Sequence, residues 1–123
     1  MQFPQKTTAD LSRAFDDALP DDPRLERRTM FGFPAGFVGG NMFAGTYGQG
    51  VVVKLPDAER ARAIEQGARA FEPTPGRVMR EYVVVPPVAL ADEAQLRGWV
   101  QRAFDYVAAL PPKDRTKPRK KAR

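Results

Sequence analysis

The sequence predicts an α+β fold with two layers, in which an antiparallel sheet carries its helices on one face. Glycine-containing turns separate short apolar runs between residues 27 and 55, a pattern typical of consecutive β-hairpins. Residues 96–107 carry an apolar stripe of helical period that is large enough to cover one face of such a sheet. Two shorter helical patterns complete the expected order: a helix, three or four strands, a helix, one or two strands, and a helix.

The first helix is expected to begin at Thr7 or Thr8, whose hydroxyl can cap its N-terminus. Its apolar residues recur at helical spacing and predict one buried face: Leu11, Ala14, Phe15, Ala18 and Leu19. Two prolines and two aspartates at residues 20–23 favour a turn, so the helix should end there.

The strands that follow are delimited by residues that favour turns, at 33–36, 39–41 and 48–50. The first strand carries apolar residues on both of its faces, which predicts a position inside the sheet. Gly45 falls in mid-strand and indicates a bulge or a close approach of another backbone. The last strand of this meander should place Lys54 on the face opposite its apolar neighbours: Val51, Val53 and Leu55.

A short helix opened by Pro56 and Asp57 is expected next, with Gly67 at its end. Three of its residues form the narrow apolar stripe that should face the core: Ala58, Ala61 and Ile64. A final strand is expected from Met79 to Val85. The closing helix has six apolar residues at helical spacing: Leu96, Trp99, Val100, Ala103, Phe104 and Val107.

Length and charge predict one folded domain, residues 1–112, followed by a disordered basic tail, residues 113–123. The net charge of +5 comes from the tail, because residues 1–112 hold 13 Lys or Arg against 14 Asp or Glu. The tail holds 7 Lys or Arg and a single acid, Asp114.

Several classes of protein are excluded by composition. The sequence contains neither cysteine nor histidine, which excludes disulfides, thiol nucleophiles, zinc sites built on those ligands and histidine-based triads. No apolar run is long enough to cross a membrane, and the N-terminal residues lack the apolar core of a signal peptide. We therefore expect a cytoplasmic protein without a membrane partner, a metal or a cofactor.

Three motifs follow one another in the meander: RRTMFG at 27–32, GNMFA at 40–44 and VVVKL at 51–55. Further on come FEP at 71–73, GRVMREY at 76–82 and Trp99. In this order the motifs resemble the TfoX N-terminal domain family, named for small bacterial regulators of natural competence, over about residues 8–110. The resemblance implies a fold of the secretion-chaperone type and a regulator that acts through other proteins, without an established reaction or catalytic residue set.

Four arginines are candidate ligand-binding or partner-binding residues. Arg27 and Arg28 head the first strand, and Arg77 and Arg80 lie beside the last one, so the four could converge on an anionic ligand or an acidic partner. The alternative is that they form ordinary surface ion pairs with nearby acids: Glu26, Glu72 and Glu81.

Asn41 and Tyr82 are polar groups beside aromatic residues and could orient a ligand. A turn former and a half-buried strand residue explain them equally well. Glu72 and Glu81 could act as an acid and base pair, but no nucleophile, metal cluster or cofactor motif accompanies them. An enzyme is therefore not indicated.

The basic tail is a candidate for weak binding of nucleic acid without sequence preference, through release of counterions from phosphates. Its candidate residues are Arg115, Lys117, Arg119, Lys120, Lys121 and Arg123. The alternative is a solubilising extension with no specific partner.

The leading hypothesis is a small regulatory or adaptor domain that acts by binding a protein partner. The alternative is a protein, or an enzyme, that binds a small anionic molecule near Arg28, Asn41, Arg77 and Tyr82. We also predict a homodimer, because strands this short leave sheet edges or apolar helix surface that self-association could cover.

Overall fold

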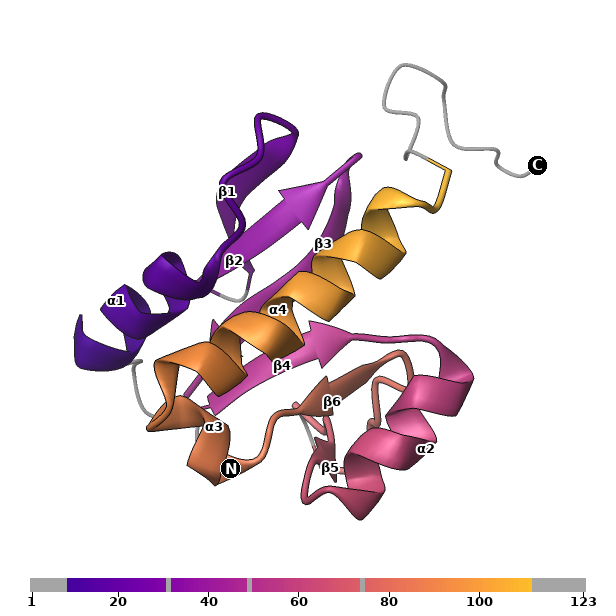
Figure 1. The fold of residues 1–123 in the computed structure, drawn as a ribbon. Helices are drawn as coiled ribbons and strands as arrows, with labels where there is room; N and C mark the ends of the chain where they lie inside the picture. Colours follow the sequence, from indigo (N-terminus) through magenta and orange to yellow (C-terminus); the bar gives the residue numbers. More distant parts are fainter. Residues whose placement is uncertain (1–8, 31, 49, 74, 112–123) are drawn as a thin grey trace.

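The computed structural model describes residues 9–30, 32–48, 50–73 and 75–111, and its fold is α+β, as predicted (Figure 1). The described residues include four helices: α1 (Ala9–Ala18), α2 (Asp57–Glu65), α3 (Pro87–Leu90) and α4 (Glu93–Ala108). They also form one antiparallel six-stranded sheet in the order β1-β2-β3-β4-β6-β5. Its strands are β1 (Leu25–Met30), β2 (Phe33–Val38), β3 (Asn41–Tyr47), β4 (Gly50–Lys54), β5 (Arg69–Ala70) and β6 (Tyr82–Val84). The predicted cap at Thr7 or Thr8 and the basic tail lie outside these residues.

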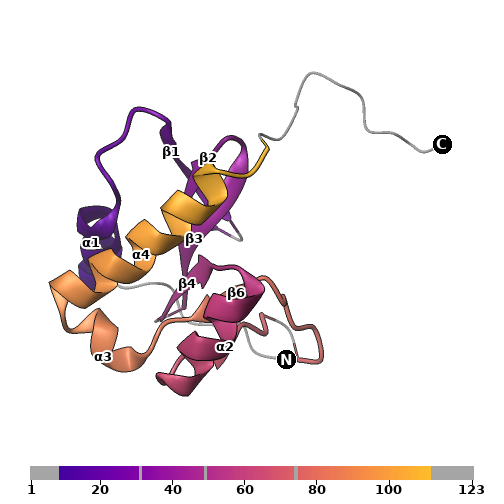
Figure 2. The ribbon, with the colours of Figure 1, turned by 45° about the vertical axis from the view of Figure 1, so that its right-hand side comes forward.

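The helices lie on one face of the sheet, with α4 crossing its middle (Figures 1 and 2). All six residues of the predicted apolar stripe of α4 are buried. Asp92 caps this helix by accepting hydrogen bonds from the backbone N–H groups of Gln95 and Ala94, which lower the pKa of its carboxyl group. None of the described helices is both long and apolar enough to cross a membrane.

A β-bulge lets two consecutive side chains of β3 enter the core between sheet and helices. The register between β2 and β3 shifts at Gly36 and Phe37, and Phe43 and Ala44 both pack in this core with no exposed surface. The ring of Phe43 meets that of Phe104 edge-on, with centroids 5.2 Å apart. The bulge therefore places the ring of Phe43 directly beneath α4.

Two glycines, one in β2 and one in β3, lie where an added side chain would meet a close neighbour. A Cβ atom at Gly36 would lie 2.9 Å from the Phe43 ring, so that ring occupies the place of the missing side chain. Gly45, predicted to mark a bulge or a close approach, is a close approach: its Cβ would lie 3.2 Å from the Cβ of Ala35. The register shift itself lies earlier in β3, at Phe43 rather than at Gly45.

The prediction that the first strand lies inside the sheet is wrong, because β1 is an edge strand whose one partner among the described strands is β2. Its Glu26, Arg27 and Thr29 are exposed. The error came from the first turn, which was expected at 33–36. Those residues belong to β2, and the chain reverses earlier, where Gly32 has a φ of 82°. The outer edge of β1 pairs with no described strand. The homodimer, which was expected to cover such an edge, stays a prediction.

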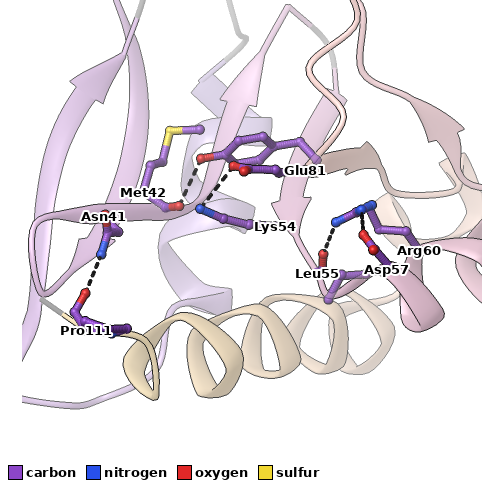
Figure 3. Close-up of polar contacts among 9 residues, drawn as sticks. Asn41, Met42, Lys54, Leu55, Asp57, Arg60, Glu81 and Pro111 are labelled. Atoms are coloured by element: carbon purple, nitrogen blue, oxygen red, sulfur yellow. Dashed lines mark hydrogen bonds and ion pairs between the residues drawn. The ribbon is translucent and has the colours of Figure 1, made fainter. Parts of the chain in front are cut away.

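The helix α2 buries Ala63 rather than the apolar stripe predicted to face the core, so that prediction is also wrong. The stripe, Ala58, Ala61 and Ile64, is exposed. One reason is Arg60, which lies one turn before Ala63 and is held there by the carbonyl of Leu55 and the carboxylate of Asp57 (Figure 3). The predicted end at Gly67 is confirmed, with a φ of 106°.

The last strand is shorter than the predicted range of Met79 to Val85. β6 contains only three residues, because the backbone turns where the N–H of Tyr82 donates to the carbonyl of Met79 at 3.1 Å. It lies between β4 and the two-residue β5. The segment before β6 is therefore a loop, and the side chains predicted to lie beside a strand end lie on that loop.

Candidate binding surface

The face of the sheet opposite the helices holds a second apolar cluster, in which half of the buried members are aromatic. Its buried members are Ala35, Phe37, Met42, Val52, Phe71 and Tyr82. Two cations lie over its rings: the guanidinium of Arg28 is 5.0 Å from the centroid of Phe37, and Lys54 Nζ is 5.9 Å from that of Tyr82. Long basic side chains thus cover part of the face that no helix covers.

The side chain of Tyr82, a candidate ligand-orienting residue, lies in the interior of the protein. Its side chain is buried, and its hydroxyl donates to the carbonyl of Met42 at 3.1 Å (Figure 3). Lys54 lies beside it and pairs with Glu81 at 3.2 Å. Burial, aided by the negative charge of Glu81, raises the pKa of the Tyr82 phenol to about 12.

This shift predicts a loss of stability at alkaline pH. Because the folded-state pKa lies above the ordinary value of 10, the contribution is complete below pH 10 and is lost as pH rises towards about 12. The expected loss in the free energy of unfolding is about 2 to 3 kcal/mol. Urea denaturation at a series of alkaline pH values should show this loss in the wild type. Tyr82→Phe should lack that component of the pH dependence, although it is itself less stable by about 1 to 2 kcal/mol. Equal slopes for the two proteins would contradict the prediction.

Three other candidates make structural contacts at separate places. Arg27 pairs with Asp16 of α1 at 2.7 Å, and Arg28 pairs with Glu26 at 2.6 Å. Asn41 Nδ2 donates a long hydrogen bond, of 3.5 Å, to the carbonyl of Pro111 (Figure 3). The six candidate residues of the folded part are therefore not gathered into one site.

Arg80 and Tyr82 do share a site, a cavity of about 220 Å³ between α2 and the loop before β6. We call it the α2 groove, and it is lined by Arg60, Ala61, Ile64, Ala70, Val78, Arg80, Tyr82 and Val83. Ile64 is 46% exposed and Val78 is 47% exposed. The exposed stripe of α2 thus lines a groove together with an apolar loop residue.

The arginines at this groove differ in how they are held. Arg60 is anchored by Leu55 and Asp57, as described above. Arg80 in the groove and Arg77 on the same loop are exposed, and neither forms an ion pair with any residue that the structure describes. The pairing of Arg77 and Arg80 with nearby glutamates, considered from the sequence, does not occur among these residues.

Ile64 and Val78 were not among the candidates from the sequence. The available signal was the stripe of α2, which is narrow and consists mainly of alanine, and it was interpreted as core. The described residues contain no group of three or more Asp or Glu that could hold a metal ion.

The model of one protein family, described as TfoX N-terminal domain, matches residues 17–107. The match runs from the end of α1 through nearly all of α4 and includes the whole sheet and the α2 groove. Searches of curated proteins and of solved structures gave no significant match.

Proposed function

The chain belongs to the TfoX N-terminal domain family, and on that premise we propose that it is a regulatory domain that binds a protein partner in the α2 groove. The partner segment carries an apolar side chain flanked by carboxylates. The observation that supports this most directly is the exposure of Ile64 and Val78, two large apolar side chains that line the groove together with Arg80. Arg80 forms no ion pair with any residue that the structure describes.

The apolar part of the groove accounts for affinity. Single exposed apolar residues are common on protein surfaces and need no explanation. Here Ala61 and Ile64 lie at i and i+3 on one helix and meet Val78 from a different segment, so a partner can cover all three at once. The floor is rigid, because Tyr82 beneath them is buried and hydrogen-bonded to the core.

The arginines account for the choice of partner. Guanidinium groups bind carboxylates with two parallel hydrogen bonds, and Arg77 and Arg80 have no described acid that competes for them. Their exposure means that each contributes modestly to affinity and more to the rate of association. An acidic, amphipathic segment fits both features of the groove.

Selection of peptides from a random display library on the immobilised protein tests the proposal. We expect enriched peptides to carry a large apolar residue between acidic ones. For a labelled peptide from this selection, Val78→Asp should weaken binding by at least about tenfold, because it places a carboxylate in the apolar contact. The double variant Arg77→Glu, Arg80→Glu should weaken it by roughly threefold to tenfold.

Matched controls distinguish the groove from general surface effects. Val88 on α3 is 65% exposed and lies outside the groove, so Val88→Asp should leave peptide binding unchanged. Arg13 on α1 is an exposed arginine outside the groove, and Arg13→Glu is the control for a change of charge. Enriched peptides without acidic residues, or equal binding by Val78→Asp and Val88→Asp, would refute the proposal.

A further inference from the structure

A larger cavity, of about 570 Å³, lies beside the N-terminal end of β4 and the C-terminal end of β6, next to α3. We propose that it binds an amphipathic monocarboxylate, a molecule with an apolar body and one carboxylate. This proposal is independent of the α2 groove, because the two cavities share only Ala70. The volume is within the range of about 300 to 1,000 Å³ that is usual for small-molecule sites.

The walls of the cavity are mostly apolar. Val52 and Val84 come from the sheet, Phe71 comes from the segment directly after β5, and α3 contributes Pro87 and Leu90. The N-terminal end of β4 is open here because it begins with Gly50, where an added Cβ would lie 3.3 Å from Val84. These surfaces suit the body of an aliphatic or aromatic ligand.

Arg69 supplies the positive charge. It pairs with Val84 across β5 and β6, and Val84 pairs with Val52 across β6 and β4, so the three side chains share one face of the sheet. The guanidinium of Arg69 therefore lies at the border of the apolar wall. Arg69 forms no ion pair with any residue in the described ranges, so a ligand carboxylate has no internal competitor.

Glu72, the other charged residue of the lining, limits the ligand to one negative charge. Its Oε2 accepts a hydrogen bond from the backbone N–H of Gly76 at 2.6 Å, so it is held by its own loop rather than by Arg69. A carboxylate fixed near the cavity repels a second anionic group on a ligand. Dicarboxylates should therefore bind less well than monocarboxylates with an equal chain length.

Calorimetric titration of the full-length protein with octanoate, octan-1-ol and octanedioate tests the inference. Octanoate should bind saturably at one site, and the alcohol and the dicarboxylate should each bind about tenfold or more weakly. Arg69→Gln should weaken octanoate binding by about tenfold and leave the alcohol unchanged. Arg62→Gln, an exposed arginine of α2 outside both cavities, should change neither titration.

A second variant tests the location of the site. Val84→Phe fills the cavity and should abolish binding of octanoate and octan-1-ol alike, provided that circular dichroism shows a folded protein. If this variant does not fold, Arg69→Gln still decides, because Arg69 is exposed. The inference is overturned if octanoate does not bind, if octanedioate binds as well as octanoate, or if Arg69→Gln leaves octanoate affinity unchanged. None of these results bears on the peptide selection, because the variants differ.

Discussion

Replacing Phe43 with alanine is expected to lower the free energy of unfolding by about 3 to 5 kcal/mol. The side chain is wholly buried in the core between sheet and helices, and its ring contacts Phe104 of α4. The loss has two parts: the transfer of the ring to water and the cavity that remains. The cavity should persist, because the bulge and Gly36 define a space shaped for a ring. A domain of this size is stabilised by about 5 to 15 kcal/mol in total, so the variant should lose a substantial fraction of its stability.

Urea denaturation followed by the fluorescence of Trp99, the only tryptophan, measures this change. Phe43→Leu should lose less than Phe43→Ala, because leucine leaves a smaller cavity. Val88→Ala, at a position 65% exposed, is the control and should change the free energy by no more than about 0.5 kcal/mol. A loss below about 1.5 kcal/mol for Phe43→Ala would mean that the core around the bulge can collapse, and the assigned role of Phe43 would be wrong.

The elements that were predicted well are those whose own residues determine their burial. In α4, six apolar residues of helical period include Trp99 and Phe104, and burying them outweighs every local alternative. The turn at 39–41 was equally clear, because Gly39 and Gly40 adopt φ values of 62° and 83° that other residues rarely tolerate. In both cases the physical cause lies within a few neighbouring residues.

The errors concern features that depend on distant parts of the chain. Whether β1 lies inside the sheet or at its edge depends on which other strands pair with one another. The apolar pattern of β1 suggested an inner strand because the turn after it was expected too late in the sequence, at 33–36. In α2 the stripe consisted of two alanines and Ile64. Burying such small side chains gains too little free energy to determine which side of the helix faces the core. The contacts of Arg60 with Leu55 and Asp57 oppose that rotation.

The candidate site was predicted in part. The sequence identified Arg77, Arg80 and Tyr82 as candidates, and the structure places Arg80 and Tyr82 in the α2 groove. It could not identify Ile64 and Val78, because an apolar residue is expected in the core until its exposure is known. Arg69 was not identified from the sequence, because β5 has only two residues and therefore no recognisable strand pattern.

Deleting the basic tail is expected to remove nearly all affinity for nucleic acid. Residues 1–112 carry a net charge of −1, from 13 Lys or Arg and 14 Asp or Glu, whereas residues 113–123 carry +6. A tail of this charge neutralises on the order of four to six phosphates, and releasing the corresponding counterions favours binding. For the same reason, affinity should fall by roughly 10²- to 10³-fold for a fourfold rise in salt concentration. Base sequence should have no effect, because phosphate contacts carry no sequence information.

Titration of a labelled DNA duplex with the full-length protein and with a version ending at Pro112, each at low and moderate salt, measures this effect. A full-length variant in which the six basic candidate residues of the tail are replaced by glutamine is the matched control, since it keeps the length and removes the charge. Both altered proteins should lose binding together, because the cause is charge rather than chain length. Binding by the protein that ends at Pro112, or full-length binding that survives moderate salt and depends on base sequence, would place a recognition surface in the folded domain instead. Absence of binding by the full-length protein even at low salt would identify the tail as an extension without a nucleic-acid partner.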